Sequence, residues 1–501
     1  MYGVIFLNLL YSTRLAYSQV IYYYLSSAVF VFREETTLQL IDDLETLLKT
    51  NKCAETKRLI NTAIGLNITG GGEEMGREGF ESLEYRDTST RTISRVLGRG
   101  AFKLVLQDDD KALAVFLKKD DEADSLRNEL LILQEILTLV LLSSHRGSMP
   151  NFLNVDAILR TKTCRRFFPE DNIAFRMELC NGDLNDVLDS DGTAGPRLSL
   201  KQVDGYFFQL FCALAYMHSV LDIYHLDIKP SNILLTSLGD ATVENGTFRY
   251  ALGDKQYSIS LPQPFAHLKV ADLGSSMACV SLYCHTTSGT LSYRPPEYFF
   301  QGPTGPAGSC TDVFAVGLMM LEAYLGRGHD EFIERKFCLS DEVEDFLFEH
   351  VDTRRLCQLV YGYFVLFSTR DDIELYRQIK SEGATGWPIG AGDVTLEFIS
   401  MLVDDATFQR HWHFFSIECG RDKDMFQLRA KLCQGEASSG HPSDGHSRLN
   451  AFLSMLRLDP SKRATAAKLA TSPLFAHLEV KGGGRSDAGD VVCRLSEDLF
   501  E

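Results

Sequence analysis

The sequence lacks an excess of basic residues, and it lacks closely paired cysteines. Lys and Arg number 50 against 68 Asp and Glu in 501 residues, so the formal net charge at pH 7 is −18. Proteins that bind phosphate backbones do so through clustered Lys and Arg, and this balance therefore argues against nucleic acid as a partner. The 12 cysteines stand singly, without a Cys-x-x-Cys pair. Neither a zinc site nor a compact disulfide scaffold is therefore expected, and the thiols are expected to be reduced.

The first 32 residues have almost no charge. Met1 to Phe32 carry only Arg14, and Leu15 to Phe32 is an uncharged run of 18 residues rich in Tyr, Val and Leu. This run reaches the length of a bilayer span, but it contains four polar residues, and the positive start of a signal peptide is missing. Residues 1–35 are a candidate membrane anchor or signal segment, with a buried helix as the alternative. The first case predicts membrane association or secretion, and the second a cytoplasmic protein.

Residues 36–90 predict a helical extension followed by a linker. From Thr36 to Asn67 apolar residues recur at helical spacing, which is typical of amphipathic helices packed on a neighbouring domain; a docking role is the alternative. Glycines then cluster from Gly70 to Gly79, so the main domain is expected to begin near Arg91. With 45% hydrophobic residues, the chain is long enough and apolar enough for two or three domain-sized units.

Residues 225–232 carry the pattern around which the rest of the chain is organised. They read His-Leu-Asp-Ile-Lys-Pro-Ser-Asn and precede an apolar run. In-line phosphoryl transfer needs a carboxylate to accept the hydroxyl proton, a cation for the migrating phosphoryl oxygens and an amide oxygen for Mg²⁺. Asp227, Lys229 and Asn232 match these three needs at the required spacing.

Four further motifs follow along the chain. They are Asp272-Leu273-Gly274, the sequence Gly-Thr-Leu-Ser-Tyr-Arg-Pro-Pro-Glu at 289–297, Asp-Val-Phe-Ala-Val-Gly at 312–317, and Leu-Asp-Pro-Ser-Lys-Arg-Ala-Thr at 458–465. Together with the loop at 225–232, they resemble the ordered motifs of the eukaryotic protein kinase superfamily. The resemblance implies that Asp272 holds Mg²⁺, that 289–297 ends an activation segment, and that Arg463 pairs with Glu297 beneath that segment.

The resemblance also implies the fold and its boundaries. We expect an α+β, two-lobed protein-kinase fold with an N-terminal extension, in which the kinase domain spans 91–480. A small β-rich N-lobe is expected over 91–179 and a larger helical C-lobe over 180–480. Asp272 follows Asn232 by 40 residues (272 − 232), so 236–263 is expected to be an inserted surface excursion. Over 328–447 the expected helices are diluted by a second insertion, which includes the polar stretch 435–447 and is expected to be disordered. Residues 481–501 are expected to form a flexible tail.

The nucleotide-binding strands depart from the family pattern. Residues 96–105 resemble the glycine-rich turn over ATP, where Gly98 and Gly100 let backbone N–H groups approach the phosphates and Val105 follows on the second strand. The third glycine position is Lys103. On the next strand, Ala114 stands where the family has its phosphate-binding lysine.

Two lysines can replace the missing one. Lys103 would project from the glycine-rich strand, as in the with-no-lysine kinases, whose Gly-x-Gly-x-Phe-Lys order is present here. Lys118 would serve in an alignment of residues 116–119 with the Phe-Ile-Lys-Lys box of a parasite kinase family. We favour Lys103, because that alignment makes the small residue Ala112 the roof over adenine and sets Glu129, the expected helix partner of the lysine, 15 residues after Ala114 (129 − 114). Lys118 stays open, as does a true loss of the cation.

Residues 175–184 resemble the last N-lobe strand and the hinge. The resemblance implies that Glu178 and Cys180 offer backbone groups to adenine and that Asp183 bonds the ribose. The loop residue before Asp227 is Leu226, where many kinases switched by phosphorylation have Arg, so no charge-assisted partner for a segment phosphate is expected there. Thr290 is expected to have a structural role near Asp227 and Lys229.

These motifs predict a protein kinase that transfers the γ-phosphate of ATP, with Mg²⁺, to Ser or Thr of protein substrates. The sequence Lys-Pro-Ser at 229–231 leans away from tyrosine specificity. The alternative is a weak or inactive pseudokinase that binds nucleotide or protein. A kinase-like enzyme for small molecules is disfavoured, because 289–297 is complete and shapes a peptide-binding ledge.

Overall fold

The computed structural model describes most of the chain from residue 83 onward. The described residues are 83–86, 90–99, 103–116, 135, 138–139, 142–143, 145–161, 172–188, 198–237, 247–278, 289–300, 308–349, 351, 353–382, 393–415, 428, 430, 447–480 and 491–500. The chain divides into an N-terminal unit, made of Met1–Asn181 and Lys269–Ser281, and a C-terminal unit, made of Gly182–Leu268 and Leu282–Glu501. The predicted segment 1–35 lies outside the described residues, as do residues 36–82 of the predicted extension and linker, 36–90.

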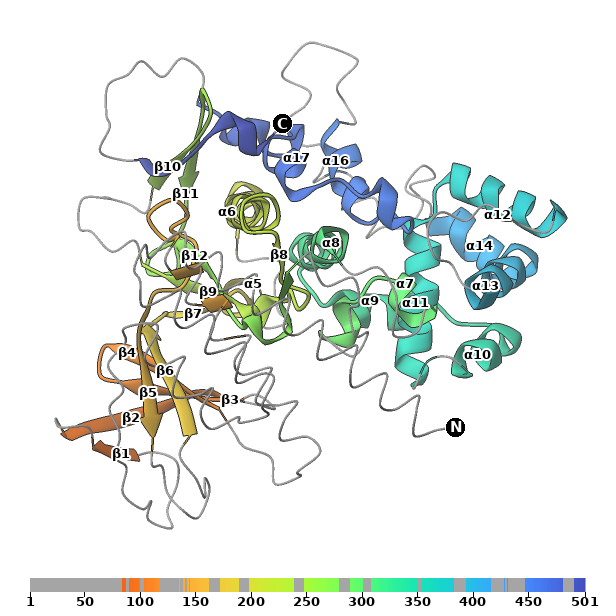
Figure 1. The fold of residues 1–501 in the computed structure, drawn as a ribbon. Coiled ribbons are helices and arrows are strands. Elements are labelled where there is room, and N and C mark those ends of the chain that lie inside the picture. Colours follow the sequence, from red (N-terminus) through yellow and green to blue (C-terminus); the bar gives the residue numbers. More distant parts are fainter. Residues whose placement is uncertain are drawn as a thin grey trace, which may run out of the picture. The chain divides into compact units, whose positions relative to one another are not determined.

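A six-stranded antiparallel sheet forms the N-terminal unit (Figure 1). Its order is β1-β2-β3-β4-β6-β5, with bounds Leu83–Arg86, Thr90–Arg99, Lys103–Asp108, Lys111–Phe116, Asn172–Glu178 and Val155–Thr161. Along β3, Leu104, Leu106 and Asp108 are buried and the residues between them are half-buried, as expected for a strand with one face on the core. β1 lies inside the stretch predicted to be linker, so the sheet begins before Arg91. β1 pairs antiparallel with β2 and adds one strand at that edge of the sheet.

Two helices form the centre of the C-terminal unit. The apolar spacing predicts a helix near 200–220, and the structure confirms it as α6, Leu200–Ser219. Ser199 starts α6 with a capping box to Gln202, which satisfies N–H groups at the helix start. The apolar α8, Ser309–Leu325, packs against α6 and ends at Gly326, whose φ of 70° is a left-handed conformation suited to glycine.

The predicted surface excursion at 236–263 is in part a packed hairpin. β10 (Thr247–Leu252) and β11 (Lys255–Ser260) pair antiparallel, and β14 (Val491–Leu495) adds to β10 in parallel. Phe208 of α6 contacts the rings of Tyr250 and Tyr257 on this hairpin. Both expectations are therefore corrected: the hairpin and β14 of the tail form one sheet against α6, because their apolar residues have a helix to cover (Figure 1).

The described part of 328–447 is mostly helical, so the predicted insertion leaves room for more packed helices than expected, whereas the polar stretch 435–446 lies outside the described residues. The described helices of this region are α9 (His329–Lys336), α10 (Asp341–Phe348), α11 (Arg354–Phe367), α12 (Arg370–Glu382), α13 (Asp393–Asp404) and α14 (Ala406–Phe415). Within α11 every residue from Leu359 to Phe367 is buried, and aromatic pairs such as Phe364 with Phe398 join it to α13. The helices gather at one end of the C-terminal unit (Figure 1). Buried aromatic area of this kind stabilises a packed subdomain.

Shorter elements make up the rest of the described secondary structure. They are β7 (Gly182–Asp183), α5 (Asn185–Leu188), β8 (Ile223–Tyr224), η1 (Pro230–Asn232), β9 (Ile233–Thr236), β12 (His267–Val270), η3 (Leu273–Ser275), β13 (Met277–Ala278), η4 (Leu291–Tyr293), α7 (Glu297–Phe300), α16 (Ser447–Met455), η7 (Pro460–Lys462), α17 (Ala466–Ala470), η8 (Pro473–Leu478) and η9 (Glu497–Leu499). A sheet-based N-terminal unit followed by a helical C-terminal unit confirms the predicted α+β class.

Within the described ranges, no single helix has both the length and the apolar character needed to cross a membrane. α8 and α9 reach both only when taken together, and they are bent by 73° relative to each other. Met1–Phe32, the stretch that led us to predict membrane contact, is not among these residues.

Candidate active site

Lys103 joins two carboxylates in the N-terminal unit. It is the first residue of β3, and its ammonium Nζ contacts the carboxylate of Glu135 and lies 2.5 Å from Asp272 Oδ1. The Lys103 and Glu135 side chains are 15% and 5% exposed, whereas that of Asp272 is 39% exposed. The sequence predicted that Lys103 and Asp272 belong to one site, and the structure brings them into contact.

Burial and charge act in opposite directions on this lysine. Burial by itself lowers the pKa of Lys103, but the charges of Glu135 and Asp272 outweigh it, so the pKa rises above its ordinary value. Burial also raises the pKa of Glu135, while the Lys103 charge lowers it. Lys103 is therefore a fixed cation throughout the physiological pH range.

The acidic partner of Lys103 is not the residue that the sequence suggested. Glu129, predicted for this role, lies outside the described residues, and the carboxylate in contact with Lys103 belongs to Glu135, six positions further on (135 − 129). The structure thus gives the role predicted for Glu129 to Glu135.

The register of β3 and β4 shows how Lys103 can replace a lysine at Ala114. Val105 pairs with Ala114, and Lys103 pairs with the next residue of the same face on β4, Phe116. Directly opposed residues in an antiparallel pair point to the same side, so Lys103, Val105 and Ala114 share one face with the buried Ala112. Gly100 and Lys118 lie outside the described residues, so the register leaves the rival lysine untested.

Gly98 has the open surroundings that a bound group needs. A Cβ at Gly98 would meet no other atom within 4 Å. Packing inside the protein therefore does not require glycine at this position. A backbone that a phosphate approaches closely does require it, so Gly98 fits the predicted nucleotide-binding turn.

A buried lysine missed in the sequence fixes the end of β6. Lys269 donates to the carbonyls of Pro150, at 2.8 Å, and Phe152, at 3.3 Å, and its Nζ lies 3.0 Å from Glu178 Oε1. Glu178 also accepts the backbone N–H of Asn154, at 2.7 Å. Its side chain therefore holds the strand end, leaving only backbone groups for the predicted adenine contact. The signal in the sequence was one lysine within the otherwise apolar run 268–271.

Two other predicted nucleotide contacts have different surroundings. Burial, and next the charge of Glu178, raises the pKa of the Cys180 thiol to about 12, so this thiol stays protonated. Asp183 lies in the C-terminal unit, where its Oδ1 accepts the N–H of Asn185, at 2.8 Å, at the start of α5. Burial raises the pKa of Asp183. A ribose hydroxyl would therefore meet a carboxylate already held in place by its own helix.

The catalytic-loop residues form a connected group in the C-terminal unit. Asp227 Oδ1 accepts both the N–H and the hydroxyl of Thr290, each at 2.7 Å. Lys229 Nζ donates to the same Thr290 hydroxyl at 2.8 Å and lies 3.1 Å from Asp227 Oδ2. Asn232 Nδ2 donates to the carbonyl of Asp227 at 2.8 Å. Thr290 therefore bonds to both Asp227 and Lys229, as its predicted structural role requires.

Asp312 and Gly289 hold this loop in a strained conformation. Asp312, fully buried on α8, accepts the N–H groups of His225, at 2.8 Å, and Leu226, at 2.7 Å. Leu226 has φ 63°, a costly left-handed conformation that these bonds maintain. Gly289 has φ 86°, and a Cβ there would lie 2.4 Å from the Leu226 carbonyl oxygen, so only glycine fits.

The predicted ion pair under the segment is present. Arg463 forms a two-pronged contact with Glu297, at 2.6 and 2.7 Å, and both residues are buried. Arg463 also lies over the ring of Phe314, 4.7 Å from its centroid. Planar guanidinium–carboxylate pairing of this kind fixes orientation as well as charge, so residue 297 has a defined place beneath the segment.

The oxygen donors predicted for a metal suit Mg²⁺ in kind. Asn232 donates through Nδ2 to the carbonyl and to Oδ2 of Asp227, which directs the amide nitrogen toward the loop and leaves the oxygen as the ligand atom. Asp272 is partly exposed and adopts φ 58° immediately before Leu273 and Gly274. Carboxylate and amide oxygens are hard ligands of the kind Mg²⁺ prefers, so both residues fit this ion.

Comparison with known proteins agrees with this geometry. Residues 91–344, about half of the chain, match the protein kinase domain family. The chain is 34% identical over 159 residues to the probable serine/threonine-protein kinase nek1 of Dictyostelium discoideum, covering 31% of this chain and 30% of that protein. It is 29% identical over 252 residues to CBL-interacting protein kinase 24 of Oryza sativa subsp. japonica, covering 49% and 45%.

A third relative is the serine/threonine-protein kinase STK11 of Rattus norvegicus, 31% identical over 154 residues, or 30% of this chain and 28% of that protein. The chain spans less than half the length of each of these curated relatives. The family match includes the loop 225–232, Asp272 and the segment 289–297, whose contacts are described above. On the family match, the motifs and the α+β architecture together, this chain belongs to the eukaryotic protein kinase superfamily.

Proposed function

We propose that this protein transfers the γ-phosphate of ATP to Ser or Thr hydroxyls of protein substrates. The observation that carries the proposal is the contact of Lys103 with both Glu135 and Asp272. Ala114 leaves β4 without the usual phosphate-binding lysine, and Lys103 supplies a half-buried, charged ammonium on the same face of the sheet. Fixed positive charge at the phosphates is the main requirement of phosphoryl transfer.

The C-terminal unit supplies the groups that act on the acceptor hydroxyl. Asp227 would orient that hydroxyl and accept its proton, since its carboxylate is already positioned by the Thr290 N–H and hydroxyl. Lys229 would stabilise negative charge on the transferred group. Its bond to Thr290 ties this cation to the segment that follows, which supports Ser/Thr rather than Tyr acceptors.

ATP and Mg²⁺ are the cosubstrate and metal that the family generally uses. Mg²⁺ bound to the phosphates would neutralise charge that develops during transfer. Asn232 would offer it an amide oxygen and Asp272 a carboxylate. Lys103 would hold α- and β-phosphate oxygens, Gly98 and Gly100 would admit the phosphates, and Glu178, Cys180 and Asp183 would receive adenine and ribose.

A catalytically silent protein is the second candidate. The observation that favours it is that Asp272 Oδ1 lies 2.5 Å from the Lys103 ammonium, which occupies the carboxylate expected to bind the metal. If this pairing persisted when nucleotide bound, the protein would act as a nucleotide- or protein-binding module instead.

Transfer of labelled γ-phosphate tests the choice. The full chain is incubated with ATP, Mg²⁺ and a mixed Ser/Thr peptide pool, in parallel with Asp227→Asn as the matched inactive control. We expect transfer by the wild type and a loss of at least about 100-fold in the variant, since the aspartate is the proposed base. Equal incorporation by both proteins at background level, with ATP binding intact, would assign the chain to the second candidate.

A further inference from the structure

A buried polar cluster lies beneath residues 290–294, which include η4 and which we call the ledge segment. The carbonyl of Ser292 accepts the Tyr363 hydroxyl at 2.6 Å and lies 2.8 Å from His329 Nε2. The neighbouring Tyr293 hydroxyl bonds to the Glu322 carboxylate at 3.0 and 3.2 Å. Side chains of α8, α9 and α11 therefore hold two adjacent residues of the ledge segment.

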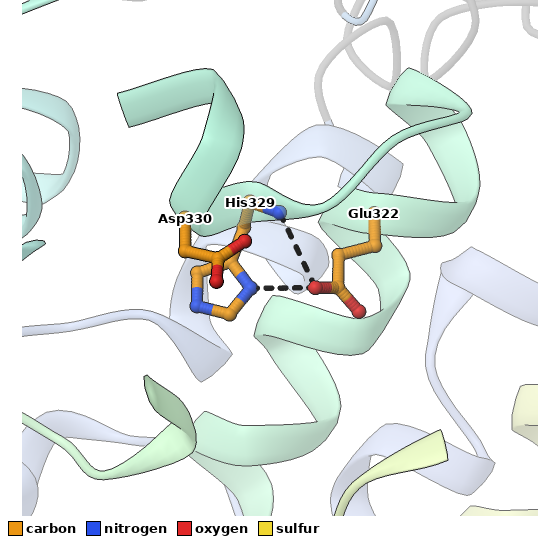
Figure 2. A group of neighbouring side chains, drawn as sticks. All are labelled: Glu322, His329 and Asp330. Atoms are coloured by element: carbon orange, nitrogen blue, oxygen red, sulfur yellow. Dashed lines mark hydrogen bonds and ion pairs between the residues drawn. The ribbon is translucent and has the colours of Figure 1, made fainter. Parts of the chain in front are cut away.

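His329 is placed between two groups that can only accept hydrogen bonds. Its Nδ1 lies 2.7 Å from Glu322 Oε1 (Figure 2), and its Nε2 lies 2.8 Å from the Ser292 carbonyl oxygen. The Tyr363 hydroxyl, 3.2 Å from Nε2, donates its own proton to the same carbonyl. An ionised carboxylate and a backbone carbonyl carry no proton to donate. Both ring nitrogens must therefore donate, and only the positively charged imidazolium has two N–H groups.

The charges around His329 favour that form. Glu322 on α8 faces Nδ1, and Asp330, the next residue on α9, lies nearby and is itself paired with Arg355 of α11 at 2.7 Å. Tyr293 and Tyr363 are the other titratable groups against the ring, at centroid distances of 5.2 and 6.2 Å. Burial by itself lowers the pKa of His329, but Glu322 and Asp330 outweigh it, and the pKa stands above the ordinary value of 6.5.

A metal ion would be a different use of the same side chains. Glu322, His329 and Asp330 each bring one ligand atom to within 4.8 Å of the others (Figure 2). The His329 nitrogens, however, each have an acceptor at 2.7 or 2.8 Å, the backbone N–H of His329 also donates to Glu322, and Asp330 holds Arg355. The cluster is satisfied by protons alone, so we attribute it to an imidazolium.

We propose that His329 is a proton-dependent positioning residue for the ledge segment: protonated, it ties Glu322 to the Ser292 carbonyl and fixes the surface against which a substrate peptide would lie. The role of that surface in peptide binding rests on the proposed function, whereas the proton-dependent tie does not. Neutral imidazole has one N–H, so it can serve only one of the two acceptors and presents a lone pair to the other. The ledge segment then loses one of its fixed contacts.

The sign of the pH dependence follows from the raised pKa. The tie contributes stability that is fully present below pH 6.5 and is lost as pH rises through the higher pKa of the folded protein. Order in the ledge segment should therefore fall as the solution becomes more alkaline. Phosphorylation, if the protein is active, should show the same change as an increase in KM for peptide at nearly constant kcat.

Two measurements on the full chain test the tie without reference to activity. The first is the NMR titration of the His329 ring, for which we expect a pKa above 6.5 in the wild type and a lower one in Glu322→Gln. The second is amide exchange at 290–294, corrected for the intrinsic pH dependence of exchange, for which we expect protection to fall about threefold or more across the His329 titration. Exchange of α6 in the same sample reports whether each variant is folded.

Variants and a chelator separate the explanations. His329→Gln should abolish the pH dependence of protection at 290–294, whereas His411→Gln should keep it, because the His411 ring bonds to the hydroxyl of Tyr361 and not to the Ser292 carbonyl. A His329 pKa at or below 6.5, or identical pH profiles for wild type and His329→Gln, would overturn the proposal. A change in protection on adding a metal chelator would overturn it in favour of a metal ion.

The kinetic readout is kept separate from these. If the full chain transfers phosphate, KM for peptide should rise severalfold with pH in the wild type and stay flat in His329→Gln, with kcat similar in both. If the chain transfers none, the proposed function fails, while the titration and exchange results still decide the tie. An active enzyme whose KM has the same pH profile in both proteins would contradict the link to peptide positioning.

Discussion

At the scale of single residues, we predict that the lysine proposed to bind the phosphates can be moved from β3 to β4. Lys103→Met should reduce phosphate transfer by about 100-fold or more, because it removes the charge that we propose holds the phosphates. Adding Ala114→Lys should restore part of the activity, since Ala114 lies on the same face and pairs with Val105 in the adjacent strand. Initial rates of peptide phosphorylation for the single and double variants measure both effects.

Two other lysines serve as controls for this exchange. Lys111→Met changes a half-buried lysine at the other end of β4 and should leave the rate within about twofold of wild type. Lys118→Met tests the rival alignment directly. A large loss with Lys118→Met and a small one with Lys103→Met would reverse the assignment of the cation.

Thr290 gives a second prediction at this scale. Its hydroxyl bonds to both Asp227 and Lys229, and hydrogen bonds to charged groups contribute about 1.5–3 kcal/mol each. Thr290→Val should therefore lower kcat by about 10- to 100-fold, and Thr290→Ser, which keeps the hydroxyl, should be close to wild type. Steady-state kinetics on a peptide substrate separate the two. Equal rates for the Val and Ser variants would show that the hydroxyl is not needed.

Functional residues that lie close together in one loop could be predicted from the sequence. Contacts between residues far apart in the sequence could be predicted less well. Asp227, Lys229 and Asn232 fall within one loop, so their mutual spacing in the sequence already limits their geometry. Glu135 is 32 residues from Lys103, and an unknown loop and helix phase lie between them. Sequence periodicity identified a helix in that region but could not fix which glutamate faces the lysine.

At the scale of elements, β14 should stabilise the inserted hairpin. Cys493 and Leu495 are buried while Arg494 between them is exposed, the alternation of a strand with one covered face. Leu495→Ala should lower the free energy of opening of β10 and β11 by about 2–3 kcal/mol, as for other buried leucines. Amide exchange of the hairpin measures this quantity locally, which suits a chain with more than one unit.

Arg494→Ala is the matched control, because it changes the neighbouring residue on the exposed face of the same strand. It should alter the opening free energy by less than about 0.5 kcal/mol. If both variants left the exchange of β10 and β11 unchanged, β14 would be an attached but dispensable strand.

Elements were predictable where the pattern is local. The spacing of Val203, Phe207, Leu210 and Leu214 gives α6 directly, because four residues of one helix face lie within a few turns. The pairing of Tyr250 with Cys493 joins residues far apart in the sequence, and no local period reports such a partner. Polar and glycine-bearing residues around 236–263 therefore looked like a surface loop, although the hairpin is buried against Phe208.

At the scale of the whole molecule, the excess of acidic residues should favour binding partners that carry positive charge. A net charge of −18 gives a negative potential that attracts basic peptides and repels polyanions, and salt screens both effects. We expect a fluorescent oligolysine peptide to bind with an affinity that falls about tenfold or more between 50 and 300 mM salt. Fluorescence anisotropy, with an oligoglutamate peptide of equal length as control, measures it. Binding of heparin or duplex DNA at physiological salt would instead reveal a concentrated basic surface, and nucleic acid would have to be restored to the candidate partners.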